Sequence, residues 1–246
     1  MASNPWIFLR GLSRGQGHWG LFPQFFLEKF PDAEVEFLDL PGCGTRNKEK
    51  SCLSMVENLE EVRKNSKWVK EGRPFSLLAI SLGGMVASLW QDLYPDEVVR
   101  SFLINTSFEK MPPWKRFNPL QIKNLVRILR ASQADDLEEA VTTLVCASEE
   151  NRKKNLPLLI DFSRKYPVAK LNMIRQIYAA ARVHFPATPK RPVVLLASRG
   201  DRLVSRDCTQ ALAGQWGAPA AFHPWAGHDL PIDDPMWVLN EIEKSS

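Results

Sequence analysis

Short, continuous runs of apolar residues alternate along this chain with longer stretches whose apolar residues are spaced as on a helix. The runs predict six strands, at residues 6–9, 35–40, 75–80, 98–105, 193–198 and 220–223. The stretches predict helices, at residues 18–30, 51–69 (with Ser51 as the cap), 82–91, 207–216 and 233–244. Continuous apolar strands that alternate with helices are typical of a parallel sheet covered on both faces. We therefore expect an α/β fold with six parallel strands.

The region between residues 107 and 189 departs from this alternation. No strand is predicted there, and helical spacing dominates at residues 120–129, 137–145, 156–162 and 171–181. We therefore predict a core formed by residues 1–107 and 188–246, with a helical cap, residues 108–187, inserted over the carboxyl edge of the sheet. Residues 109–186 hold 14 Lys and Arg against 8 Asp and Glu, whereas the rest of the chain holds 18 against 20. The positive charge is concentrated in the cap.

The stretch Pro74–Gln91, PFSLLAISLGGMVASLWQ, contains the pattern on which the functional prediction depends. A predicted buried strand ends at Ser81, and a Gly- and Ala-rich apolar helix follows. The small residues Ala79 and Gly83 lie two positions before and two positions after Ser81, as required where a strand and a helix nearly touch around a strained turn. This pattern favours Ser81 as a nucleophile, although a buried serine after a strand is commonly only structural.

Composition narrows the functional classes. With 246 residues and 44% apolar content the chain can form one large core, and its net charge of +4 is too small to indicate nucleic-acid binding. The histidines are not paired at ligand spacing, and no phosphate loop or repeat occurs, so we expect no metal and no cofactor.

The cysteines and the N-terminus bear on location. The four cysteines are scattered without a C-x-x-C spacing, and the first five residues do not resemble the start of a signal peptide. We expect reduced thiols and a cytoplasmic protein. The uncharged span 74–91 approaches the length of a membrane span, but its serines and its glycine pair favour an interior strand and helix.

Two further residues follow Ser81 in the chain order of a Ser–Asp–His triad. Asp201 comes just after the strand 193–198, and His228 lies in a loop between the last strand and the last helix. Both positions are at carboxyl ends of strands, where open α/β sheets place their sites. A serine hydroxyl needs a neighbouring base of near-neutral pKa, and the imidazole of His228 needs a carboxylate to fix its tautomer. Asp201 can alternatively be a turn residue or a helix cap.

An oxyanion formed on attack by Ser81 needs backbone N–H donors. The residue after the nucleophile, Leu82, gives one. The glycine-rich loop after the first strand, residues 10–17, lies at the same edge and gives the other, which we assign to Leu12.

Together these segments resemble the α/β-hydrolase superfamily over nearly the whole chain. The resemblance rests on residues 10–19, 39–44, 81–87, 200–204 and 227–228. It implies an α/β-hydrolase fold and an acyl-enzyme on Ser81, with no cofactor. The compact size, the helical cap and the Gly-Asp-x-Leu-Val segment look most like small carboxylesterases, such as the pimeloyl-[acyl-carrier protein] methyl ester esterases of biotin synthesis.

Three features depart from that superfamily. Arg10 stands where a histidine is usual, and Ala79 stands where a glycine is usual. The first strand also begins too early for the antiparallel strands that usually precede it, so we expect a shortened sheet.

Two sets of residues in and near the cap are candidates for binding. An apolar acyl pocket, or equally the packing of cap on core, can use Trp114, Phe117, Phe162 and Tyr178. We expect His18 and Trp19 at the pocket as well, with His18 as a helix-entry residue that faces the pocket rim and not as a catalyst. An acidic partner such as an acyl carrier protein can dock on Arg127, Arg130 and Arg152, although basic residues on a helix most often form a solvated face. Nucleic acid is not expected, because no stacking aromatics alternate with the basic residues.

The predicted activity is hydrolysis of a carboxylic ester or thioester. The same triad also supports acyl transfer, lactone opening, carbon–carbon bond hydrolysis and cofactor-free haloperoxidation, since a fold does not fix the chemistry. A further alternative is a non-catalytic module that binds a small apolar ligand under the cap.

Overall fold

Six parallel strands form one sheet in the computed structural model of the chain, which describes residues 5–186 and 188–245. The order across the sheet is β2-β1-β3-β4-β5-β6, and all five pairings are parallel, as predicted. The strands are β1 (Trp6–Leu9), β2 (Val35–Leu38), β3 (Phe75–Ile80), β4 (Val98–Ile104), β5 (Val193–Ser198) and β6 (Ala220–His223). Residues 1–4, which were compared above with the start of a signal peptide, lie outside the described residues. Residue 187 of the predicted cap also lies outside them.

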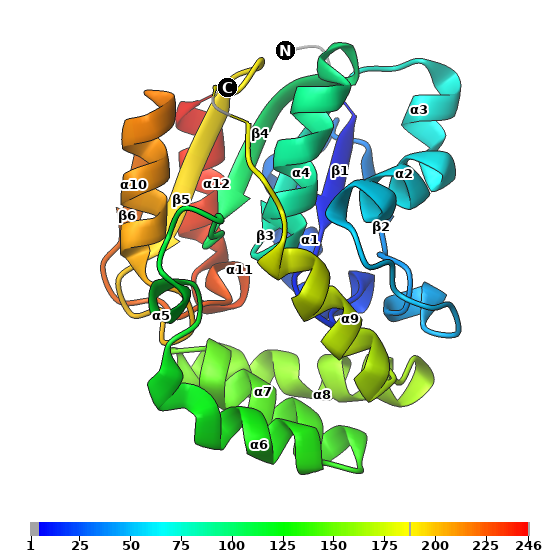
Figure 1. Cartoon of the computed structure of the whole chain (residues 1–246), viewed down its shortest axis with the longest axis vertical. Coiled ribbons are helices and arrows are strands. Elements are labelled where there is room, and N and C mark those ends of the chain that lie inside the picture. Colours follow the sequence, from blue (N-terminus) through cyan, green and yellow to red (C-terminus); the bar gives the residue numbers. More distant parts are fainter. Residues whose placement is uncertain (1–4, 187, 246) are drawn as a thin grey trace.

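Helices cover both faces of the sheet (Figure 1). One face packs against α2 (Met55–Asn65), α3 (Lys67–Glu71), α4 (Leu82–Leu93) and α10 (Arg206–Trp216). The other packs against α1 (Phe22–Lys29), α11 (Leu230–Asp233) and α12 (Pro235–Lys244). Short 3-10 turns complete the core, at η1 (Gln16–Trp19), η2 (Gly44–Arg46) and η3 (Pro95–Glu97).

Strand β3 shows why the strands are continuously apolar. Leu77 and Ala79 point into the core on one side of the sheet, and Leu78 and Ile80 point into the core on the other. All six residues of β3 are buried. Because both faces are covered, neither face tolerates the polar residues that alternate in a half-exposed strand.

A helical insertion lies beyond the carboxyl ends of the strands (Figure 1). It agrees with the helical spacing predicted between residues 107 and 189. Its helices are α5 (Pro113–Arg116), α6 (Ile122–Arg130), α7 (Ala134–Val145), α8 (Glu149–Lys165) and α9 (Lys170–Ala181), with a 3-10 turn η4 (Pro119–Gln121) before α6. A small cluster joins it to the core, since Leu144 and Leu159 of the insertion pack with Ile232 of α11. The division into a core and a cap at residues 108 and 187 stays a prediction.

The helix predicted at residues 51–69 is two helices, and its predicted cap is wrong. Ser54 caps α2, and Ser66 ends α2 and caps α3 through hydrogen bonds from backbone N–H groups. Ser51 lies before this helix, and its hydroxyl donates to Pro41 O at 2.7 Å. Three serines in one segment offer the same local signal, and only the path of the chain decides which one caps.

Gly83 lets the start of α4 touch the end of β1. A Cβ atom at this position would lie 2.6 Å from the carbonyl oxygens of Leu9 and Arg10, closer than non-bonded atoms approach. The loop that follows β1 can therefore pass directly beside Ser81. The small residue two positions after Ser81 is thus a requirement of backbone contact.

Gly83→Ala is expected to destabilise the protein by about 1–3 kcal/mol, because backbone atoms cannot move aside for the added methyl group. Gly214→Ala in α10 is the matched control, since a Cβ there meets no atom within 4 Å. The control should be neutral or stabilising by up to about 1 kcal/mol, because alanine favours a helix interior. Urea unfolding measures both, and equal stability of the two variants would contradict the close contact.

Candidate active site

Ser81 lies in a strained turn between β3 and α4. Its backbone φ is 56° and its ψ is −119°, a conformation that residues other than glycine rarely adopt. The Ser81 N–H donates to Ile104 O at 2.8 Å, and Thr106 Oγ1 donates to Ser81 O at 2.9 Å. The neighbouring strand β4 and the loop after it therefore hold the turn in place.

The loop after β1 lies against Ser81. A Cβ atom at Gly11 would lie 3.1 Å from Ser81 Cβ and 3.6 Å from Ser81 Oγ. Leu12 is the next residue, and among the loop backbone hydrogen bonds of the described residues none uses its N–H. Leu82 is the first residue of α4, so its N–H has no acceptor within the helix.

Asp201 and His228 form a buried pair. His228 Nδ1 lies 2.7 Å from Asp201 Oδ2, and the side chains are 10% and 1% exposed, respectively. The other oxygen, Asp201 Oδ1, accepts hydrogen bonds from the N–H groups of Leu203 and Val204 at 2.7 and 3.0 Å. The carboxylate is thus fixed from both sides, and Nε2 of His228 is the nitrogen left to accept a proton.

Burial and charged neighbours act in opposite directions on the pKa of His228. Burial opposes the charged form, but the charge and hydrogen bond of Asp201, with a smaller contribution from Asp229, outweigh burial and Arg10. The pKa of His228 is therefore raised above its ordinary value. An imidazolium formed by proton transfer would be stabilised at this position.

The three predicted triad residues lie on three loops at the carboxyl edge of the sheet, after β3, β5 and β6. The hydrogen bonds of the described residues join Asp201 to His228 and do not include one from Ser81 Oγ to His228. In proteins of this kind such a contact commonly tightens only when a substrate is bound.

Asn105, which the sequence marked only as the end of a strand, ties these loops together. Its amide nitrogen donates to His228 O at 2.9 Å and to Ser198 Oγ at 3.1 Å, and its amide oxygen accepts from the Ser198 N–H at 2.9 Å. Its φ of 48° turns the chain sharply away from β4. The sequence feature that could have drawn attention to Asn105 is an amide side chain at the end of an apolar strand.

Buried carboxylates that the sequence did not single out fix the surrounding loops. Asp233 accepts hydrogen bonds from the N–H groups of Ala147, Ser148 and Gly227, at 2.6–3.0 Å, and so joins the insertion to the loop of His228. Asp39 joins the loops after β1 and β2 in the same way. Burial raises the pKa of both carboxyl groups, against the opposing effect of these N–H donors.

A comparison with protein families agrees with this geometry. A model described as the alpha/beta hydrolase family matches residues 6–241, a span that contains the whole sheet, the insertion and all three triad candidates. The chain belongs to this family. The predicted fold, with a six-stranded parallel sheet and a helical insertion, is thereby confirmed.

Relatives and solved structures extend the comparison. Over 119 residues the chain is 31% identical to the biotin biosynthesis bifunctional protein BioHC of Teredinibacter turnerae, a match that covers 48% of this chain and 18% of that protein. The esterase RhEst1 from Rhodococcus sp. ECU1013 superposes with a TM-score of 0.76 at 16% identity, covering 99% of this chain and 90% of that one. A thermophilic esterase from Thermogutta terrifontis superposes with a TM-score of 0.71 at 17% identity, covering 98% and 89%. At such identities the structures establish a shared fold.

A buried polar cluster fastens the insertion of this alpha/beta hydrolase to the loop after β1. Arg14 Nη1 donates to Glu138 Oε1 of α7 at 2.7 Å. The hydroxyl of Ser163, on α8, donates to the same oxygen at 2.6 Å and lies 3.0 Å from His18 Nε2. Burial, with Arg14, lowers the pKa of His18 to about 4. Burial alone would raise the pKa of Glu138, but Arg14 and His18 outweigh it and lower that pKa.

Two of the residues predicted to line an acyl pocket are structural. His18 is buried in the cluster just described, and Trp19 has no exposed surface and packs among the aromatic rings of β1 and α1. Neither side chain presents surface to a pocket in this structure, and its assignment to one stays a prediction. Phe162 meets the His18 ring edge-on, with ring centroids 5.0 Å apart, and so belongs to the contact between insertion and core.

The other three predicted pocket residues lie on the insertion. Trp114 is 64% exposed at the start of the insertion, and Phe117 follows it, half-buried. Tyr178 lies on α9, with the Arg182 guanidinium 3.8 Å from its ring centroid. Trp114 lines an open groove whose lining includes Asp201 but neither Ser81 nor His228, so its role in a pocket stays a prediction.

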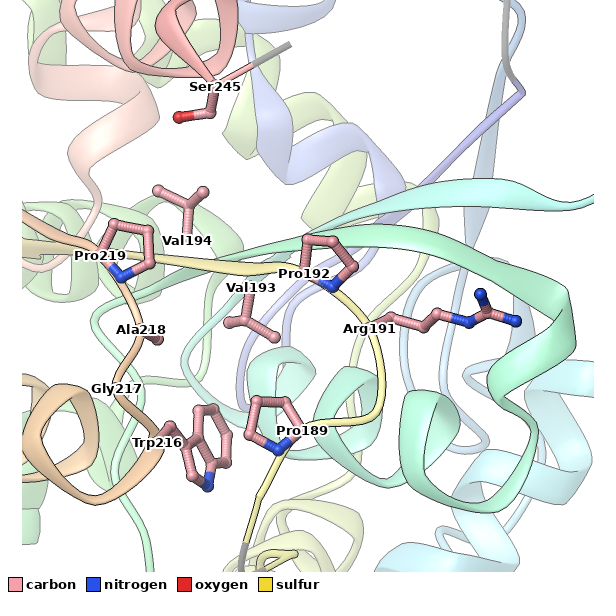
Figure 2. A pocket seen from close by; sticks show the side chains of 10 residues that line it. All are labelled: Pro189, Arg191, Pro192, Val193, Val194, Trp216, Gly217, Ala218, Pro219 and Ser245. Atoms are coloured by element: carbon pink, nitrogen blue, oxygen red, sulfur yellow. The ribbon is translucent and has the colours of Figure 1, made fainter.

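A second open groove lies away from the site (Figure 2). Its lining includes Pro192 and Pro219, just before β5 and β6, and so it opens at the amino edge of the sheet, opposite Ser81. Its cation, Arg191, donates to Asp96. The groove therefore contributes nothing to the candidate active site.

The cysteines are free, and burial raises the pKa of Cys43 and Cys208 to about 12, which keeps both protonated and poorly nucleophilic.

In the part of the chain that the structure describes, no three side chains of His, Cys, Asp or Glu stand together as metal ligands. No helix within residues 5–186 and 188–245 is both long and apolar enough to cross a membrane.

The lowered pKa of His18 predicts a loss of stability in acid. The unfolded chain binds a proton near pH 6.5, whereas folded His18 binds it only near pH 4, so the free energy of unfolding falls as the pH drops from 6.5 toward 4. Between pH 7 and 5 this linkage amounts to about 2 kcal/mol. His18→Gln keeps polar atoms but cannot titrate, and its urea-unfolding free energy should fall less over this range than that of the wild type.

The matched control is His184→Gln, because His184 is exposed. Its pH profile should parallel the wild type. If His18→Gln also paralleled the wild type, the buried neutral state of His18 would be refuted.

Proposed function

We propose that this alpha/beta hydrolase cleaves a carboxylic ester or thioester through an acyl-enzyme on Ser81. The observation that carries the proposal is the buried Asp201–His228 pair, 2.7 Å between Oδ2 and Nδ1, at the same sheet edge as the strained turn of Ser81. A serine, an imidazole and a carboxylate in this arrangement suit attack on a carbonyl with proton transfer. The shared fold with two esterases and the partial match to BioHC are consistent with an ester substrate.

Each step has a residue to perform it. Ser81 Oγ attacks the carbonyl carbon while His228 Nε2 accepts its proton, and Asp201 holds the resulting imidazolium. The N–H groups of Leu12 and Leu82 donate to the oxyanion, and losing one such donor typically costs about 10²–10³ in rate. Collapse expels the alcohol or thiol, which takes the proton from His228. Water then attacks the acyl-enzyme by the same steps and releases the acid.

Other uses of the same residues stay open as alternatives. Acyl transfer replaces water with a second alcohol, and lactone or carbon–carbon bond hydrolysis changes only the bond that breaks. Cofactor-free haloperoxidation is a further alternative, and so is a non-catalytic module that binds a small apolar ligand. Turnover of a simple ester and its dependence on Ser81 separate the hydrolase from the binding module.

Hydrolysis of p-nitrophenyl esters, from acetate to laurate, tests the proposal directly. The wild type should turn over at least part of the series, and Ser81→Ala should lower kcat/KM by at least about 10³-fold, because the nucleophile is removed. The chain length with the highest kcat/KM measures the space available to the acyl group.

Ser101→Ala is the matched control. Ser101 is buried in β4, and within the described residues its hydroxyl has no hydrogen-bond partner, so the variant should keep wild-type turnover. Ester turnover that survives in Ser81→Ala would overturn the assignment of the nucleophile. A folded wild type without turnover on any ester would favour the binding module.

An acidic acyl carrier protein is the partner we propose for this site. Arg127 and Arg130 lie exposed on α6, and none of the ion pairs among the described residues involves them. Exposed Ile122 and Val126 lie on the same helix, which contains no acidic residue. The third predicted docking residue, Arg152, does not fit, because it is only 15% exposed and pairs with Glu139 at 2.7 Å.

Arg127→Glu/Arg130→Glu should raise KM for a carrier-linked ester by about tenfold, since like charges then meet an acidic partner. Turnover of p-nitrophenyl esters should not change. Lys153→Glu/Lys154→Glu is the control, because these exposed lysines of α8 already pair with Glu149 and Glu150. An equal rise in KM for both double variants, or for neither, would rule out docking through α6.

A further inference from the structure

A buried ion pair bridges two loops of the candidate site. Arg10 Nη1 donates to Asp229 Oδ1 at 3.1 Å, and Arg10 Nη2 donates to Asp229 Oδ2 at 2.5 Å. The side chains are only 4% and 3% exposed. Arg10 also lies over the Trp19 ring, 4.9 Å from its centroid. The two residues are 219 positions apart in the sequence, so only the fold brings them together.

Each partner is adjacent in sequence to a group used in the proposed reaction. Arg10 precedes Gly11, which lies against Ser81, and Leu12, whose N–H we assign to the oxyanion. Asp229 follows His228, and its own N–H donates to Val145 O of the insertion. The ion pair therefore spans the distance between the oxyanion donor and the base.

Stability alone does not account for a buried ion pair. Removing two charges from water costs several kcal/mol per ion, and apolar side chains of similar volume often serve folding equally well. What a bidentate arginine–carboxylate pair adds is fixed distance and fixed orientation, since two parallel hydrogen bonds define the plane of both groups. At this place, that rigidity acts on the two loops that must face the same carbonyl group.

The charges of the pair also act on the base. The groups that face His228 are Asp201 across Nδ1, Asp229 beside it and Arg10 beyond, with Cys146 of the insertion near the pair. Burial raises the pKa of the Cys146 thiol well above its usual value, so the thiol is neutral. Asp229 favours the imidazolium and Arg10 disfavours it, so the pair as a unit largely leaves the base under the control of Asp201.

We propose that the Arg10–Asp229 ion pair is a clamp that holds the oxyanion loop and the His228 loop at a fixed separation. Arg10 and Asp229 are then positioning residues for the reaction proposed above, on which this inference rests. Neither side chain contacts the substrate or takes part in proton transfer.

The test uses a reaction that does not require the correct ester. A fluorophosphonate probe reacts once with an activated serine: an O–P bond forms at Ser81, the P–F bond breaks, fluoride leaves, and the hydroxyl proton passes to His228. In Arg10→Met/Asp229→Leu both charges are removed together, so no unpaired charge stays buried. We expect its labelling rate to fall about 10²-fold, the effect of misplacing reacting groups by about 1 Å, at an almost unchanged urea midpoint.

Arg63→Met/Glu97→Leu is the matched control. This pair is partly buried and joins α2 to η3, which lies just before β4 at the opposite edge of the sheet. Its labelling rate should equal that of the wild type. Labelling of the Arg10→Met/Asp229→Leu protein within threefold of the wild type would overturn the clamp.

Two further variants keep the clamp testable if the double variant does not fold. Arg10→Lys retains the charge but not the two parallel bonds, and should label about tenfold more slowly, whereas a purely electrostatic role would leave its rate unchanged. In Asp229→Asn the unopposed Arg10 should move the acid limb of the labelling–pH profile to lower pH, and an unmoved limb counts against coupling to His228.

Failure of the clamp and failure of the proposed function give different results. If the wild type is labelled at Ser81 but hydrolyses no ester, the proposed substrate class is wrong. The labelling rates of the variants still test the clamp in that case. A wild type that does neither overturns both.

Discussion

The backbone of β1 and the first turn of α4 touch through Gly83, and the rest of the site depends on this contact. With no side chain between them, the loop after β1 runs directly against Ser81. One proposed oxyanion donor, Leu12, and the other, Leu82, then lie on the two sides of a single contact. A larger residue at position 83 would separate the loop from the nucleophile, because the clashing atoms are backbone atoms of Leu9, the last residue of β1, and of Arg10.

The loops at this edge are joined mainly by polar side chains rather than by apolar packing. Loops at the end of a sheet carry N–H and C=O groups that no strand satisfies, and burial makes each unpaired group costly. Asn105 and Asp233 each bond several such groups at once, between loops that are distant in sequence. The Arg10–Asp229 pair and the Arg14–Glu138 pair extend the same network to the oxyanion loop and the insertion. Loop geometry at the site is therefore tied to buried charges.

The features that depend on a local pattern of residues could be predicted from the sequence. The strands could be predicted because burial on both faces makes them continuously apolar, and Ser81 could be selected because small residues flank it where strand and helix touch. Partners that meet only in the fold could not be predicted. Asp229 lies next to His228 in the sequence, but its partner Arg10 is 219 residues away, so no local pattern could indicate the ion pair. Trp19 was predicted to line a pocket, because the sequence does not show whether an aromatic side chain beside a loop points outward or into the core.

The balance of charge around His228 follows from this network. Two carboxylates, Asp201 and Asp229, lie close enough to raise the pKa of the imidazole against the effect of burial, and Arg10 lowers it. Arg10 offsets one of them through the ion pair. The charge that remains is that of Asp201, which bonds Nδ1 and so stabilises an imidazolium while leaving Nε2 to exchange the proton. The carboxylate next to the base is thus paired with a cation from the oxyanion loop, and the two charges act on the imidazole in opposite directions.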